Sequence, residues 1–275
     1  MSDTLFTNTG APQGTVLSPF LFSLYTADCR TTHVDCALDK YADDTALTGQ
    51  ITDDDDTTYL QEINRFVQWC DENYLELNVN KTKEMIIDFR RTKADPVPVE
   101  LKGSDVERVQ TYKYLGVVID NTLSWSQNTD VIMKKLNTRM YCLRKLRSFN
   151  VNSQILQMFY SSVICSVLTF GLTCFWGNMN QCDKNKMNKI IKKAGGVIGK
   201  KLDTMDILID GRTHKKMKSI LSEDSHPLRH DFDIHKIVRS GRFRIPKSKT
   251  NRYLNSFIPS AIRIFNKRNG RSTLT

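Results

Sequence analysis

The sequence contains no aspartate or glutamate after Asp233, and the acidic residues among its 275 positions are unevenly distributed. Residues 1–80 hold 3 Lys and Arg against 14 Asp and Glu, a net charge of −11. Residues 81–275 hold 37 against 16, a net charge of +21. This asymmetry favours a polyanionic partner such as a nucleic acid for the second part of the chain; the alternative is a solvated basic surface without a partner.

The seven cysteines include no Cys-x-x-Cys pair, and their number is odd. Most of them lie among apolar residues, which is typical of buried thiols in a reduced, intracellular protein, so no disulfides are expected. The sequence does not distinguish a nuclear from a cytoplasmic location. A zinc site stays an alternative, although the spacing of its candidate ligands matches no zinc-finger pattern. Those candidates are Cys174, Cys182, His226, His230 and His235.

The N-terminal residues lack the basic-then-apolar pattern of a secretory signal peptide. Residues 155–176 carry no charge, and a stretch of this length could span a membrane. Polar side chains such as Gln157, Ser162 and Thr169 interrupt it throughout. We therefore expect a buried helix in a helical region rather than a membrane span, and no membrane partner.

The hydrophobic pattern divides the chain into a mixed helix-and-strand part and a basic helical part. In the first part it predicts helices at residues 17–29 and 57–77 and strands at 34–49, 84–89 and 112–120. In the second part it predicts helices at residues 128–146, 153–176 and 184–199. The stretch "GGVIGKK" (195–201) lacks the spacer and the Ser or Thr of a phosphate-binding loop, so we expect it to end a helix at a glycine.

Two adjacent carboxylates, Asp43 and Asp44, interrupt a stretch that otherwise favours β-structure. Carboxylate oxygens are the ligands that Mg²⁺ prefers, and two such ions can clamp an in-line attack on phosphorus. The alternative is a turn in which both aspartates are merely solvated.

The context of this pair decides between the two. "YADD" (41–44) resembles the metal-binding box of reverse transcriptases. Stretches that resemble other boxes of that family occur along the chain in the same order as in the family. "GAPQGTVLSPFLFSLY" (10–25) is similar to the box that holds the template and the incoming nucleotide. "LELNVNKTKEMIIDF" (75–89) resembles the next box, and "YKYLGVVID" (112–120) resembles the primer-grip hairpin. The form "GAPQGTVLSPFLF" and the C-terminal stretch 226–266 resemble non-LTR retrotransposons of the LINE type. The resemblance covers nearly the whole chain.

The resemblance implies an α+β fold: a partial palm with an antiparallel sheet and helices, then an all-α thumb-like region and a basic tail. The expected divisions are the partial palm at residues 1–122, the thumb-like region at 123–205 and the basic C-terminal region at 206–275. The implied activity is RNA-directed DNA polymerisation on an RNA template and a DNA primer, with Mg²⁺ or, in its place, Mn²⁺.

Residue roles follow from the resemblance. Gln13 offers a two-sided amide for orienting a base or sugar, with a plain turn as the alternative. Lys81 could steady the pyrophosphate leaving group as a point charge, with a solvated lysine as the alternative. The implied catalytic and metal-binding residues are Asp43 and Asp44; the nucleotide- or template-binding residues are Pro12, Gln13, Gly14, Tyr41 and Lys81; the primer-grip residues are Tyr114, Leu115 and Gly116.

The sequence departs from the family in one respect. The family's palm has a further metal-binding aspartate on a strand well upstream of the "PQG" box, whereas Asp3 is the only acidic residue before Gly10 here. We therefore expect the chain to lack the fingers and half of the metal site, and to be an inactive remnant of a retrotransposon polymerase. Two alternatives stay open: a non-catalytic RNA- or DNA-binding protein that uses the basic thumb and tail, and a polymerase completed by another chain.

Overall fold

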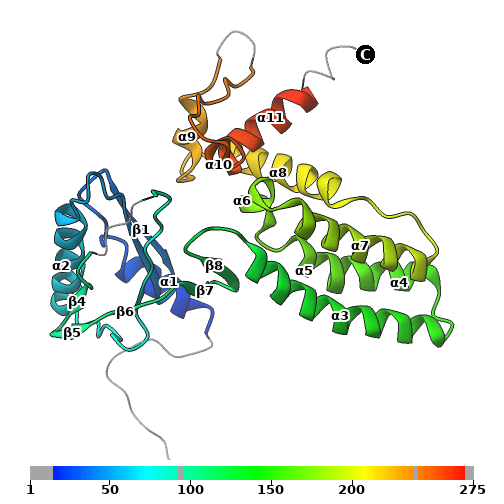
Figure 1. Cartoon of the computed structure of the whole chain (residues 1–275), viewed down its shortest axis with the longest axis horizontal. Helices are drawn as coiled ribbons and strands as arrows, with labels where there is room; N and C mark the ends of the chain where they lie inside the picture. Colours follow the sequence, from blue (N-terminus) through cyan, green and yellow to red (C-terminus); the bar gives the residue numbers. More distant parts are fainter. Residues whose placement is uncertain (1–14, 92–95, 238–240, 270–275) are drawn as a thin grey trace, which may run out of the picture. The chain divides into compact units, whose positions relative to one another are not determined.

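The computed structural model describes residues 15–91, 96–237 and 241–269. These residues form a mixed helix-and-strand fold, as expected for the α+β class (Figure 1). The chain divides into two compact units, residues 1–109 and 110–275. The charge asymmetry follows this division, because unit 1 holds 10 Lys and Arg against 20 Asp and Glu, and unit 2 holds 30 against 10. The division into a palm, a thumb-like region and a tail stays a prediction.

Unit 1 is built around a β-hairpin with a helix packed on it. β1 and β2 pair antiparallel in a register that runs from Cys36–Gly49 to Tyr41–Asp44, which confirms the strands expected around the aspartate pair. A small apolar core that includes Ile63, Val99 and Val106 joins the helix α2 to this hairpin and to the short strands that follow. The bounds are α1 Leu17–Tyr25, β1 Cys36–Tyr41, β2 Asp44–Gly49 and α2 Thr57–Glu72.

The rest of unit 1 contains very short strands. The strand expected at residues 84–89 is wrong, because only Lys83–Glu84 (β3) pairs, in parallel with Glu107–Arg108 (β6). Ion pairs fix this contact: Lys83 Nζ lies 2.6 Å from Glu107 Oε2, and Arg108 Nε lies 2.9 Å from Glu84 Oε2. Glu100–Leu101 (β4) and Ser104–Asp105 (β5) form a second small hairpin.

Unit 2 begins with the expected hairpin at residues 112–120. β7 (Thr111–Tyr114) and β8 (Val117–Asp120) pair antiparallel. The long helix α3 (Ser126–Ser148) follows, and buried Asp120 organises its start. Its carboxylate accepts hydrogen bonds from the Thr122 and Ser124 backbone N–H groups, at 3.0 and 3.2 Å, and from both hydroxyls.

The uncharged stretch is not one continuous helix, so that expectation is corrected. It begins as α-helix, passes through one π-helical turn, and then breaks where Phe170 is extended and Gly171 adopts φ +69°. Its apolar residues are buried in the core of unit 2. Among the described residues, no single helix is long and apolar enough to cross a bilayer. Two helical segments bent by 41° from each other, Ser153–Thr169 and Leu172–Asn178, together have the length and apolar composition of a membrane span. The pieces are α4 Ser153–Phe159, η1 Tyr160–Cys165, α5 Ser166–Thr169, α6 Leu172–Phe175 and η2 Trp176–Asn178.

The remaining helices complete two apolar cores in unit 2. α7 and α8 pack on α3 and the broken helix, while α8 also packs on the C-terminal helices around Met217, Phe232 and Phe265. Gly199 ends α7 in the left-handed region (φ 81°), as the glycine-cap prediction required. The bounds are α7 Gln181–Ile198, α8 Met205–Ser222, α9 Arg229–Asp233, α10 Asn251–Leu254 and α11 Phe257–Asn269.

Candidate functional site

Asp43 and Asp44 lie at the tip of the β1–β2 hairpin. Tyr41 and Asp44 form the last pair of the ladder, so Ala42 and Asp43 make a two-residue turn. Ala42 has φ 53°, a left-handed conformation that non-glycine residues seldom adopt and that is most often found at turns and functional sites. Both carboxylates are exposed. The hairpin therefore presents two adjacent carboxylates on a strained turn, where a ligand can reach them.

The other residues expected around the pair have different surroundings. Tyr41 is 66% exposed, directly before the turn. Lys81 lies in a tight turn, in which its backbone N–H donates to the Asn78 carbonyl oxygen and to Asn78 Oδ1, both at 3.1 Å. The Lys81 side chain is exposed, and within the described part of the chain no hydrogen bond or ion pair joins it to either aspartate.

Two sets of expected residues cannot be placed beside this pair. Pro12, Gln13 and Gly14 lie outside the described residues. Tyr114, Leu115 and Gly116 belong to unit 2, at the tip of the β7–β8 hairpin.

The β7–β8 tip has the geometry of a tight two-residue hairpin turn. Leu115 and Gly116 have φ 45° and φ 84°, and positive φ at both central residues is the type I′ pattern. The turn is closed by the Tyr114–Val117 pair. A Cβ built on Gly116 would approach Phe170 Cε1 to 3.5 Å, so the backbone here lies close to the aromatic ring.

Lys40 supports the carboxylate turn, which the sequence did not predict. Its ammonium donates to the Thr26 carbonyl oxygen and, at 2.9 Å, to the Cys29 carbonyl oxygen. Thr26 is the C-terminal cap of α1. A cation at a helix C-terminus interacts favourably with the unsatisfied carbonyls there, so Lys40 joins the end of α1 to the strand that leads into Asp43.

Glu62 on α2 is the second unpredicted support. Its side chain is 6% exposed and accepts hydrogen bonds from the Thr32 and His33 backbone N–H groups, each at 3.0 Å, and from the Thr32 hydroxyl. Burial opposes ionisation of this carboxyl, but the hydrogen bonds from Thr32 and the charge of Arg65 outweigh burial and lower its pKa. Glu62 therefore fixes the segment that enters β1. One signal was available in the sequence: an acidic residue four positions before Phe66 on the apolar face of a helix.

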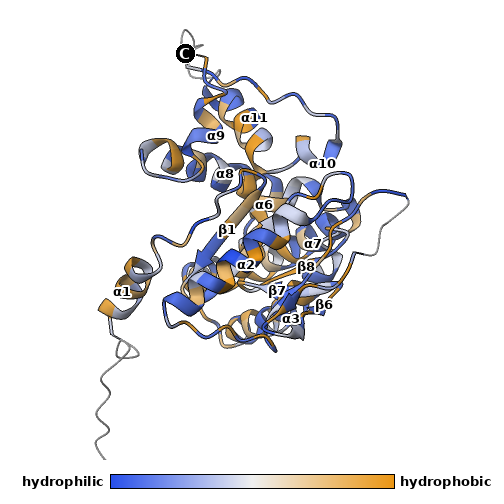
Figure 2. Cartoon of the chain, turned by 90° about the vertical axis from the view of Figure 1, so that its left-hand side faces the viewer, coloured by the Kyte–Doolittle hydropathy of each residue, from blue (hydrophilic) through white to orange (hydrophobic). Residues whose placement is uncertain are grey.

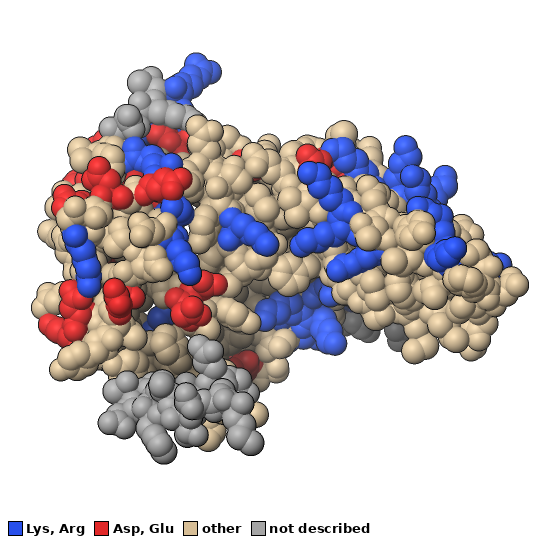
Figure 3. Space-filling model, turned by 90° about the horizontal axis from the view of Figure 1, so that it is seen from below, with Lys and Arg blue, Asp and Glu red and all other residues tan. Residues whose placement is uncertain are grey.

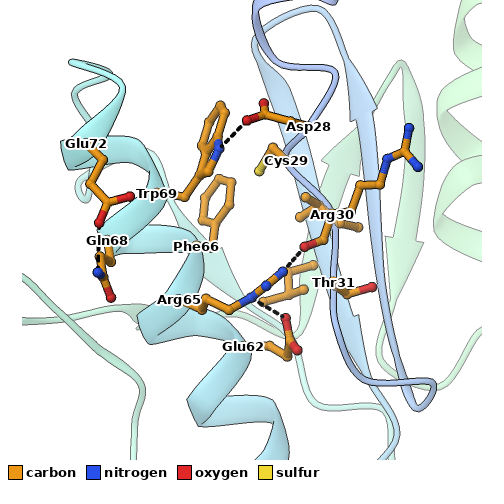
Figure 4. A pocket seen from close by; sticks show the side chains of 12 residues that line it. Asp28, Cys29, Arg30, Thr31, Glu62, Arg65, Phe66, Gln68, Trp69 and Glu72 are labelled. Atoms are coloured by element: carbon orange, nitrogen blue, oxygen red, sulfur yellow. Dashed lines mark hydrogen bonds and ion pairs between the residues drawn. The ribbon is translucent and has the colours of Figure 1, made fainter.

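A pocket of about 230 Å³ lies beside these supports, between α2, the hairpin and residues 28–31 (Figure 4). The Arg65 guanidinium points from α2 to the Arg30 carbonyl oxygen and to Glu62, and Trp69 Nε1 donates to Asp28 Oδ2 at 3.5 Å. Neither Asp43 nor Asp44 lines this pocket. Its polar groups already bond to one another, so it supports the packing of α2 on the hairpin.

The acidic pair supplies only part of a magnesium ligand set. Over residues 15–91, 96–237 and 241–269, no group of three or more His, Cys, Asp and Glu side chains is placed to hold a metal ion. Mg²⁺ is commonly held by one or two carboxylates together with waters and phosphate oxygens, so Asp43 and Asp44 fit one side of such a site. A site for two ions needs more oxygen ligands than this pair provides. The seven cysteines are free thiols; Cys29, Cys36, Cys70 and Cys165 are buried.

Comparison with known proteins adds a family. Residues 2–119 match the model of the reverse transcriptase (RNA-dependent DNA polymerase) family. Residues 125–166 match the model of the N-terminal region of alkylated DNA repair protein alkB homolog 8. The second match covers α3 with the start of the broken helix, and no solved structure matches significantly.

Curated relatives agree with the first match. The chain is 29% identical to an RNA-directed DNA polymerase from mobile element jockey of Drosophila melanogaster, over 66% of this chain and 20% of the relative. It is 25% identical to the jockey polymerase of Drosophila funebris, over 94% of this chain and 30% of the relative. It is 26% identical to a probable RNA-directed DNA polymerase from transposon BS of Drosophila melanogaster, over 67% of this chain and 22% of the relative. The chain thus spans less than a third of the length of these relatives.

Proposed function

Because this chain belongs to the reverse transcriptases of LINE-type retrotransposons, we propose that it is the part of an RNA-directed DNA polymerase that carries the Asp43–Asp44 turn. In this proposal the first unit is a partial palm, the helices of the second unit form a thumb, and the last residues form a basic C-terminal region. The observation that supports it most is the strained hairpin tip, which exposes two adjacent carboxylates inside the matched region.

In the complete enzyme, Asp43 and Asp44 would hold Mg²⁺, which neutralises charge on the phosphates of the incoming nucleotide. Tyr41, beside the turn, would contact the nucleotide, and Lys81 would contact its leaving phosphates. The β7–β8 tip, Tyr114 to Gly116, would lie against the primer. The partners are then an RNA template and a DNA primer.

We propose further that the 275 residues alone do not polymerise. Two carboxylates from one hairpin tip leave a two-ion site without the ligands that a second strand would add, and the described residues gather no third acidic group beside them. Loss of one side of such a site removes much of the charge stabilisation on which phosphoryl transfer depends.

Primer extension tests this proposal. The purified chain is incubated with a DNA primer on an RNA template, deoxynucleotides and Mg²⁺ or Mn²⁺, beside Asp43→Asn and the matched control Asp39→Asn. Asp39 is an exposed carboxylate on β1 of the same hairpin. We expect no extension by any of the three. Extension that appears only when a second polypeptide is added, and that needs Asp43, would instead identify a polymerase completed by another chain.

Nucleic-acid binding without catalysis is a second candidate function. Unit 2 carries 30 Lys and Arg against 10 Asp and Glu, a net charge of +20. Contacts between cations and phosphates release counterions, so the affinity should fall steeply as salt rises, with a slope of about 0.7 per phosphate contact on a single strand. A salt titration of RNA and DNA binding measures this slope. An affinity that does not change between low and physiological salt would exclude the candidate.

A further inference from the structure

One face of α3 carries aromatic rings between cations. Lys134, Tyr141, Lys145 and the C-terminal cap Phe149 are spaced by seven, four and four residues, and this spacing places them along one side of a helix. Tyr141 is 60% exposed and Phe149 is 68% exposed. Both lysines are exposed as well. We call these four residues the α3 stripe; at 1.5 Å per residue it is roughly 20 Å long.

The cations of α3 follow its one acidic residue, Asp130, which lies four positions before Lys134 and 3.7 Å from Lys186 Nζ. No Asp or Glu lies between Asp130 and Asp183, whereas α3 alone contributes six Lys and Arg after Asp130. Within the described residues none of these six forms an ion pair. Figure 3 shows Lys and Arg side chains gathered over the part of unit 2 that this view presents, with little acidic surface among them. The charges of Lys134 and Lys145, which are both exposed, are therefore available to an external polyanion.

The α3 stripe is held on a rigid support. The opposite side of α3 is buried in the core of unit 2, where Leu136 and Leu143 are fully buried. Lys145 Nζ lies 5.2 Å from the centroid of the Phe149 ring, a cation–π contact that positions this ring beside a charge. A phosphate near Lys145 and a base on Phe149 would then lie side by side.

We propose that the α3 stripe binds a single-stranded nucleic acid, whose bases stack on Tyr141 and Phe149 while its phosphates contact Lys134 and Lys145. Aromatic rings interleaved with cations are how proteins bind single strands without sequence readout. A duplex does not fit, because its bases are already stacked and paired and offer no free face. This proposal deepens the second candidate function and rests on it.

The test measures the affinity of the full chain for three fluorescent probes of equal length by anisotropy: an unpaired oligonucleotide, its abasic counterpart, and a blunt duplex. The variants are Tyr141→Leu with Phe149→Leu, and the control Tyr74→Leu, an aromatic that is 95% exposed in acidic unit 1. Circular dichroism checks that each variant keeps its helix content. The charge variant Lys134→Gln with Lys145→Gln is measured across salt concentrations.

We expect the aromatic double variant to bind the unpaired strand at least about fivefold more weakly, with the salt slope unchanged. Its affinity for the abasic strand should equal that of the unmodified chain, and Tyr74→Leu should change nothing. The charge variant should bind all probes more weakly and with a shallower salt slope.

Two results would overturn the proposal, and they differ in meaning. In the first, the unmodified chain binds abasic and normal strands equally, or the aromatic double variant binds the unpaired strand as tightly as the unmodified chain does. Either outcome would show that bases do not stack on α3, while binding through charge alone would still stand. Absence of any salt-dependent binding by the unmodified chain would remove the candidate function itself together with this proposal.

Discussion

The Lys40 ammonium donates a hydrogen bond to the Cys29 carbonyl oxygen at 2.9 Å and a second one to the Thr26 carbonyl oxygen. One side chain on the strand that leads to Asp43 thereby satisfies carbonyl groups at and just beyond the end of α1. None of the residues of α1 is buried, and Leu17, Phe20 and Leu24 are exposed on it. In Figure 2, α1 carries the orange of apolar residues. The helix therefore depends on polar contacts such as this one for its attachment to the hairpin.

Replacement of Lys40 by methionine tests this attachment. Lys40→Met keeps most of the aliphatic stem but removes the ammonium donor from both carbonyl oxygens, of which the Thr26 oxygen keeps only the Cys29 backbone N–H at 3.3 Å. The loss of these hydrogen bonds to a charged group should cost about 1–3 kcal/mol. We expect backbone amides of residues 36–41 to exchange with solvent faster, as measured by hydrogen-exchange mass spectrometry. The matched control is Lys113→Met, an exposed strand lysine of unit 2, which should leave exchange unchanged. Unchanged exchange in Lys40→Met would contradict the supporting role.

Glu62 makes the stability of unit 1 depend on pH. Its pKa is lowered from 4.5 in the folded state, so the folded form binds its proton less readily than the unfolded form does. The stabilisation from this carboxylate is complete above pH 4.5 and is lost as the pH falls through the lower, folded-state pKa. Protonation removes the negative charge of Glu62 and so weakens the hydrogen bonds that Thr32 and His33 donate to it.

For Glu62→Gln we therefore expect the free energy of unfolding, measured by urea titration at pH 6, to be lower by about 1–3 kcal/mol. Between pH 6 and pH 3 this variant should lose less further stability than the unmodified chain. Glu76→Gln, at an exposed position after α2, is the control and should follow the unmodified chain at both pH values. An identical pH dependence in Glu62→Gln and in the unmodified chain would show that this carboxylate does not contribute.

Two glycines of unit 2 should respond oppositely to alanine. A Cβ on Gly177 would overlap the Asn255 carbonyl oxygen, so η2 and the segment before α11 pack backbone to backbone. Gly177→Ala should destabilise unit 2 by about 1–3 kcal/mol, since the backbone must shift. Gly196 lies in α7 with nothing within 4 Å of a built Cβ, so Gly196→Ala should stabilise the helix by about 1 kcal/mol. Thermal unfolding followed by circular dichroism compares the two; similar melting temperatures would contradict the packing described here.

The sequence predicted the elements whose pattern is local. The hairpin around Asp43 and the helix α3 follow from alternating and helical periodicity, and both formed close to the expected residues. A helix end at a glycine was also predicted, and Gly199 ends α7 with a left-handed φ, which glycine adopts without steric cost. The position of Asp43 and Asp44 between two strands was likewise predicted, because acidic residues between two β-favouring stretches favour a turn.

Elements that depend on distant partners were not predicted. Residues 84–89 have the composition of a strand, yet only Glu84 among them pairs, because strand formation needs a neighbour in register as well as β-branched side chains. The uncharged stretch breaks at Gly171, where a Cβ would lie 3.2 Å from Val117 of β8, a contact that no local pattern reveals. Lys40 and Glu62 were missed for the same reason, since their roles depend on backbone groups that the fold brings to them.

Primer extension by the chain and by Asp43→Asn is the measurement that tests the central claim most directly. It should be repeated over a range of protein concentrations on an RNA template with Mg²⁺, beside Asp39→Asn. The account predicts no extended primer in any lane, with salt-dependent RNA binding retained by all three proteins. Extension by the unmodified chain and by Asp39→Asn, lost in Asp43→Asn, would contradict it, because this chain or a self-associated copy would then complete the metal site.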